Sequence, residues 1–266
     1  MITIFWRTIK DRWRMLAAVT IIGSLVQFMY TSLFPTYSKS FGQSEELFKQ
    51  MPEALKKAFN MDQFSFNTLD KFLTIEMYSF FWIILMILFT LSLAGTSFAG
   101  DVERETVTLT AGQPVSRSRV FWGRYLAGVK LFSVFNIVVN FIVLPIASAF
   151  KLHIDPLHLL TIMVMGELFG LAVFSVATAV STFLTDKSKV YMIVGGTLLV
   201  TYVMNIISGI SEKFANIKYA SPFYYFNPNT FLVKGQYNTA AVLVFGSVII
   251  IGTVVAWWRW RQRDIL

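Results

Sequence analysis

Long apolar runs alternate with short polar segments along the whole chain. Six windows of about 20 or more mostly apolar residues stand out, at 15–34, 78–99, 131–150, 159–184, 190–210 and 240–258. A stretch of about 20 such residues crosses the hydrocarbon of a bilayer as an α-helix, in which every backbone polar group is paired. The windows are continuous, whereas a barrel strand would alternate. We therefore predict an all-α integral membrane protein, a single transmembrane domain of residues 1–266 with six transmembrane helices.

The segment before the first window has an amphipathic pattern. Its apolar residues fall on one helical face and its charged residues on the other; the apolar set is Ile2, Phe5, Trp6, Ile9 and Trp13. Such a helix lies in the membrane interface, with its rings at the acyl boundary. We predict an N-terminal interfacial amphipathic helix over 1–14. The alternative is a basic flank that only fixes topology.

The arginines indicate the orientation of the spans. An even number of spans places both termini on one side, and every arginine of the chain falls on that side. Short basic loops remain in the cytoplasm, so we predict cytoplasmic N- and C-termini. Segments 35–77 and 211–239 are then extracellular. The middle of the first, 44–59, has helical spacing, and the second contains four consecutive aromatic residues between Pro222 and Pro228, where a short interfacial or re-entrant helix is expected.

Composition removes several function classes. Apolar residues make up 55% of the chain and charged residues 14%, against about 25% charged in a soluble domain. There is no cysteine and there are only two histidines, so neither a thiolate site nor a zinc enzyme is expected, and we predict no metal. The net charge of +8 fits loops that face anionic lipid, so we predict membrane lipid and no nucleic acid as a partner.

The most polar stretch on the predicted cytoplasmic side is 100–119, between the second and third windows. Acids lie at its start and arginines at its end, an order that suits a short helix because carboxylates are stabilised at the N-terminal end of the helix dipole. Val107, Leu109 and Ala111 give it a mildly apolar side. Such a helix could dock into a groove on another protein. It could equally be a solvated connector.

This stretch resembles the permease subunits of type-2 ATP-binding-cassette (ABC) exporters, which carry a pattern E-R-x-x-G-T-L-E-L-L-L-x-Q-P-V-S-R after the second span. The matching positions here are Gly100, Asp101, Glu103, Arg104, Thr106, Leu109 and 113–117 (QPVSR). The amphipathic start, the segment 221–228 (SPFYYFNP) and the end 261–264 (RQRD) agree with the same family. Glu105 and Thr108 depart from it, since the family has Gly and Glu there.

The resemblance implies a permease of a type-2 ABC exporter fold whose loop 100–119 is a coupling loop. Its helix 101–113 would contact an ATPase subunit through Asp101, Glu103, Arg104, Glu105, Thr106, Leu109, Gln113 and Pro114. The implied partners are two ABC ATPase subunits and a second permease copy or homologous permease. This chain has no G-x-x-x-x-G-K-[ST] motif, so it is not expected to be an enzyme by itself or to bind a cofactor, and ATP and Mg²⁺ would be held by the partner.

The implied activity is export of a hydrophobic, peptide-like or drug-like substrate through the cell (cytoplasmic) membrane. Two alternatives remain open, an ATP-independent secondary transporter and a non-transporting membrane sensor or scaffold. Glu167 is the one formal charge within the windows. An ionisable group at that depth is a candidate functional site, and the alternative is a structural contact between helices.

Overall fold

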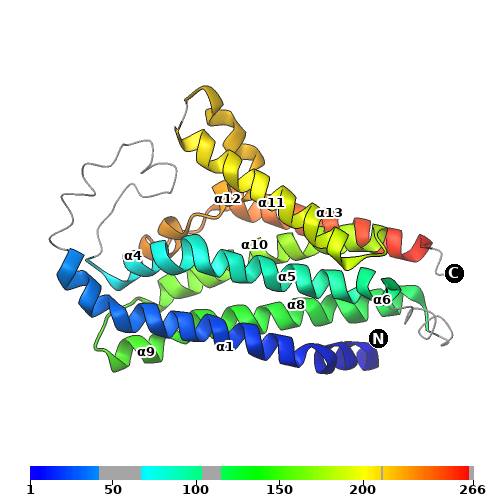
Figure 1. Ribbon diagram of the computed structural model, residues 1–266, viewed down its shortest axis with the longest axis horizontal. Helices are drawn as coiled ribbons and strands as arrows, with labels where there is room; N and C mark the ends of the chain where they lie inside the picture. Colours follow the sequence, from blue (N-terminus) through cyan, green and yellow to red (C-terminus); the bar gives the residue numbers. More distant parts are fainter. Residues whose placement is uncertain (42–66, 104–114, 211, 264–266) are drawn as a thin grey trace.

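The computed structural model describes residues 1–41, 67–103, 115–210 and 212–263, and every regular element in these ranges is helical (Figure 1). Six helices, or runs of consecutive helical segments, are long and apolar enough to cross a membrane, which confirms the predicted number of spans. The predicted helix at 44–59 lies outside the described residues. The first residues of α1 and the last residues of α13 lie at the same end of the bundle, called here the terminal side; the other end is the opposite side.

The elements in chain order are α1 (Ile2–Phe41), α4 (Leu69–Leu73), the π-helical turn η1 (Thr74–Phe81), α5 (Trp82–Ser97), α6 (Ala99–Glu103), α8 (Arg117–Phe141), α9 (Val143–Ala149), α10 (Pro156–Phe183), α11 (Lys187–Ile210), the 3₁₀ segment η2 (Glu212–Ala220), α12 (Pro222–Tyr225), the π-helical turn η3 (Asn229–Val233) and α13 (Thr239–Gln262). The spans are formed by α1, by α4 to α5, by α8 to α9, and by α10, α11 and α13.

Several helices extend beyond the predicted windows, because a hydropathy window marks only the part of a helix that lies in hydrocarbon. The segment 1–14 is helical as predicted, but it continues into the first span without a break, so α1 has 40 residues. The same helix passes Pro35 and ends at Phe41, and the next span begins at Leu69. Both ends of the predicted extracellular segment 35–77 therefore belong to helices that continue from the spans.

Local chemistry explains where the helices break. The third span is interrupted at Ile142 because Pro145 has no N–H to donate to the carbonyl of Phe141. α10 begins at Pro156, and the preceding Asp155 side chain accepts a hydrogen bond from the backbone N–H of Leu157. Ser221 and Pro222 start α12 in the same way, which gives the short helix expected between the two prolines.

α10 lies at the centre of the fold and packs against α5, α8 and α13. Glycines allow the close approach of α8 and α10. A Cβ at Gly170 would lie 2.0 Å from the Phe132 ring, and a Cβ at Gly128 would lie 2.4 Å from the Phe174 ring. α11 leans away from this core toward its C-terminal end, and η2 folds back along it (Figure 1).

Candidate functional site

The structure describes the two ends of the predicted coupling loop, residues 100–103 and 115–119. The backbone of Asp101 and the whole of Glu103 belong to α6. The other candidate residues, Arg104, Glu105, Thr106, Leu109, Gln113 and Pro114, lie outside the described residues. The site is therefore built from α6 and from the side chains that hold it.

Two arginines from different helices bind the end of α5, from which the loop departs. The last carbonyls of a helix have no partner within it, and cations are stabilised there by the helix dipole. The Arg12 Nη2 atom of α1 donates to the carbonyl of Thr96 at 2.9 Å. The Arg124 Nη1 atom of α8 donates to the carbonyl of Ser97 at 3.0 Å. These two bonds connect α1 and α8 to the point where the loop begins.

A buried serine of α10 bridges the break between α5 and α6. The Ser181 Oγ atom accepts a hydrogen bond from the Ala99 N–H at 3.0 Å and donates to the Ala94 carbonyl at 3.0 Å. Ser181 is fully buried, so neither bond competes with water. The first residue of α6 is thus attached to the central helix of the bundle.

Glu103, the last residue of α6, reaches the start of α11. Its Oε2 atom accepts from the Lys187 N–H at 3.3 Å, and its Oε1 atom lies 3.8 Å from Lys187 Nζ. Asp186 also accepts from the Ser188 N–H at 2.7 Å. Two carboxylates therefore cap the N-terminus of α11, where negative charge is favoured.

The chain end closes the same surface. Arg263 is 7% exposed. Its guanidinium donates from Nη1 to the carbonyl of Thr182, in the last turn of α10, at 3.2 Å, and from Nη2 to the carbonyl of Leu184, just beyond that helix, at 2.8 Å. Burial, and to a smaller extent the charge of Arg259, lowers the pKa of Arg263. Trp260 donates from its indole N–H to the Arg117 carbonyl at 3.2 Å, which joins α13 to the start of α8.

These contacts form one set, called here the terminal-side network; its members are Arg12, Glu103, Arg124, Ser181, Lys187 and Arg263. From the sequence, these arginines indicate only the topology, and their contacts with helix ends are not predicted. Their place near helix ends on one side of the bundle was visible, but the carbonyls they bind belong to other helices. Nothing in the sequence pairs them.

Glu167 lies in a second polar cluster, between α8 and α10 within the span. Its Oε1 atom accepts from Ser133 Oγ at 2.6 Å, and its Oε2 atom accepts from Asn136 Nδ2 at 2.8 Å. Asn136 also donates to the Met163 carbonyl at 2.9 Å, and Asn140 donates to Asn136 Oδ1 at 2.8 Å. Both carboxyl oxygens are therefore engaged by neighbouring side chains, an arrangement that joins two helices. Within the described ranges, no group of three or more metal-ligating side chains is present.

The comparison with protein families gives one finding that spans the fold. A family model described as "ABC-2 family transporter protein" matches residues 2–265. No curated protein matches the chain. The match covers all six spans, the terminal-side network and the loop between α6 and α8.

Proposed function

We propose, from the premise that this chain belongs to the ABC-2 family of transporter proteins, that it is the membrane half of an ATP-driven exporter. Family membership and six apolar helices make it a multi-pass cell membrane protein with the role of a transport permease. The proposal adds three points. Two separate ATPase subunits supply the energy, the loop 100–119 is where they act, and a second permease subunit completes the pathway.

One observation supports this mechanism most directly, the attachment of the loop's first turn to several spans. Hydrogen bonds from Arg12, Arg124 and Ser181 join the α5–α6 junction to α1, α8 and α10, and Glu103 joins it to α11. A displacement applied to the loop by a partner would therefore be carried into four other helices. This is the kind of packed two-state element that a ligand in a partner subunit can bias.

The first test is recovery of the ATPase. A nucleotide-binding protein should purify with the tagged full-length chain, and Glu103→Ala combined with Leu109→Ala should reduce its recovery. Lys234→Ala and Gln236→Ala, both exposed on the opposite side, form the matched control and should leave recovery unchanged. Purification of the chain alone, with efflux driven by a proton gradient and without ATP, would identify a secondary transporter and overturn the proposal.

The second test separates binding of the ATPase from transmission of its motion. A spin-label pair is placed on the terminal side of α1 and on the opposite side of α10, in a complex with bound ATPase, and the distance is measured with and without ATP and Mg²⁺. Ser181→Ala removes the bridge between α10 and the loop and should reduce the ATP-dependent change in distance, while the ATPase stays bound. An undiminished change would exclude transmission through this contact.

The polar cluster around Glu167 gives no comparable support for secondary transport. Both carboxyl oxygens of Glu167 accept hydrogen bonds from side chains of α8. A carboxylate that is satisfied in this way favours helix contact, in agreement with the modest free energies of hydrogen bonds between membrane helices. We therefore assign Glu167 to structure within this proposal.

A further inference from the structure

An apolar cavity of about 300 Å³ lies between α10, α11, α13 and the η2–α12 segment. Its walls include Val173 and Val176 of α10, Thr201 of α11, and Val248 of α13. The Thr201 hydroxyl donates to the Leu198 carbonyl of its own helix at 2.9 Å, so this wall offers little to a polar ligand. An apolar cavity of this kind stays dry and accepts hydrocarbon. A cavity of about 150 Å³ holds benzene, which has six carbon atoms. This cavity has about twice that volume and therefore has room for about a dozen methylene groups.

The cavity exists because α11 packs loosely against the rest of the bundle. Only Val190, Val194 and Leu198 of its 24 residues are buried. The helix leans away from α10 toward its C-terminal end (Figure 1), and the last residues of η2 line the space between them. Val176, in the wall of the cavity, is 38% exposed, so the space is open to the surroundings of the spans, which in a membrane are acyl chains.

A positive charge lies beside the cavity where η2 covers it. Lys218 is half-buried, and its Nζ atom lies 5.2 Å from the ring centroid of Tyr219, which lines the cavity, and 5.1 Å from that of Tyr224. The Tyr225 hydroxyl donates to the Tyr219 carbonyl at 3.2 Å and fixes this segment. Among the side chains that the structure describes, no carboxylate forms an ion pair with Lys218. Lysine and tyrosine side chains placed in this way are typical of the membrane interface.

We infer that this cavity binds one acyl chain of an anionic phospholipid from the leaflet on the opposite side, with the lipid phosphate beside Lys218. The apolar walls fit the chain, the lateral opening admits it from the bilayer, and the charge of Lys218 complements the phosphate. Tyr219 contributes to both parts of the site, since it lines the cavity and Lys218 lies over its ring. The inference does not rest on ATP coupling or on the direction of transport.

The test is native mass spectrometry of the full-length chain in mild detergent, with phosphatidylglycerol or phosphatidylcholine of equal chain length added. We expect one retained phosphatidylglycerol per chain and a clear preference over phosphatidylcholine. Val176→Trp and Thr201→Trp narrow the cavity from opposite walls and should each reduce retention at least about tenfold, since most of the acyl contact is lost. Lys218→Gln should reduce phosphatidylglycerol retention about fivefold and phosphatidylcholine retention less, because the choline cation offsets the charge of its phosphate.

Matched controls keep the result specific. Val254→Trp places the same ring on an exposed part of α13 outside the cavity, and Lys234→Gln removes an exposed lysine outside it; both should retain lipid like the unsubstituted chain. Circular dichroism checks that each variant folds. If Val176→Trp and Thr201→Trp retain as much phosphatidylglycerol as the control Val254→Trp, the inference is overturned. So would an unchanged lipid preference in Lys218→Gln, or a dimer whose second copy excludes lipid from the cavity.

Discussion

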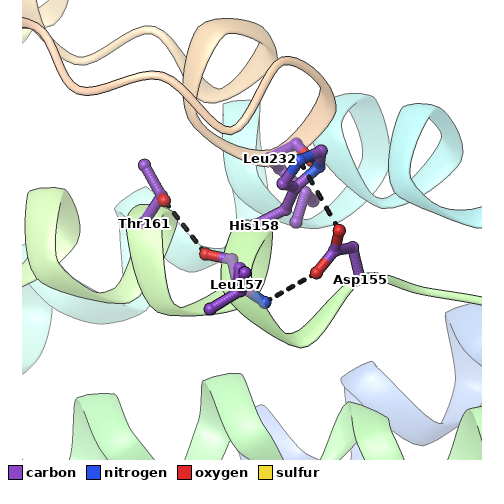
Figure 2. Close-up of polar contacts among 5 residues, drawn as sticks. All are labelled: Asp155, Leu157, His158, Thr161 and Leu232. Carbon is purple, nitrogen blue, oxygen red and sulfur yellow. Dashed lines mark hydrogen bonds and ion pairs between the residues drawn. The ribbon is translucent and has the colours of Figure 1, made fainter.

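At residue 235, the backbone and a side chain from another helix both require glycine. Gly235 has a φ of +62°, in the left-handed region, and a Cβ there would lie 2.3 Å from His158 Cδ2. The His158 Nδ1 atom lies 3.0 Å from the Leu232 carbonyl, and its Nε2 atom lies 3.8 Å from Asp155 Oδ2 (Figure 2). A carbonyl only accepts, so Nδ1 carries the proton. This contact attaches the start of α10 to η3, just before the turn at Gly235.

The first prediction concerns this contact. Gly235→Ala should lower the free energy of unfolding by about 3 kcal/mol, from left-handed strain of about 1–2 kcal/mol and a ring clash of comparable size. His158→Ala removes the ring with which the new Cβ clashes. The double variant should therefore lose less unfolding free energy than the two single variants lose together. Equilibrium unfolding in mixed micelles measures all three variants. Strict additivity would show that the His158 ring does not confine residue 235.

Glu167 gives a second prediction at the scale of one side chain. Glu167→Leu removes both acceptors of the α8 donors and should lower the free energy of unfolding by about 1–2 kcal/mol, because each hydrogen bond between membrane helices is worth about 0.6–2 kcal/mol. Glu167→Gln keeps an acceptor and a donor and should lose less than about 1 kcal/mol. If Glu167→Gln instead abolishes transport without changing stability, the residue has a functional charge.

Among the elements, the number of helical spans could be predicted from sequence, because about 20 apolar residues in hydrocarbon leave the backbone no alternative to a helix. Their ends could not. α1 continues through Pro35 and α8 begins at Arg117, since polar residues beyond the hydrocarbon stay helical when neighbouring helices support them. The break at Ile142, in contrast, has a local cause in Pro145.

The third prediction tests the packing of α8 against α10. Gly170→Ala places a Cβ 2.0 Å from the Phe132 ring and should cost about 1–3 kcal/mol of unfolding free energy through overpacking. Gly196→Ala is the matched control, because a Cβ there has no neighbour within 4 Å. It should be neutral or stabilising by up to about 1 kcal/mol, the gain in helix propensity. A comparable loss in both variants, measured by unfolding in mixed micelles, would mean that the ring of Phe132 yields without cost.

For the whole molecule, the family and the polar loop could be predicted from residues close together in sequence. The terminal-side network could not, because its bonds join residues far apart along the chain, such as Arg12 with Thr96 and Glu103 with Lys187. Its arginines, whose presence is already explained by topology, donate to backbone carbonyls, which carry no sequence signal. Only the packing of the helices brings them together.

The fourth prediction tests the orientation of the molecule. The chain has no cysteine, so a single introduced thiol can be labelled without background. Gln236→Cys and Gln262→Cys replace the same exposed residue type on the opposite side and on the terminal side. Because arginine-rich loops stay in the cytoplasm, a membrane-impermeant maleimide should label Gln236→Cys in intact cells and Gln262→Cys only after permeabilisation. The reverse pattern would invert the topology.

The unbroken length of α1 has a mechanical consequence. Its 40 residues make a rod of about 60 Å, about twice the thickness of the hydrocarbon that it crosses. Arg12, near the N-terminal end of α1, attaches this helix to the Thr96 carbonyl. A small rotation about that contact therefore displaces the far end of the helix by a larger distance. From Arg12 to its end at Phe41 the helix is about 43 Å long, so a tilt of about 5° moves the far tip by about 4 Å, most of the rise of one helical turn. A small rearrangement on the terminal side can thereby move the end of α1 on the opposite side by most of the length of one helical turn.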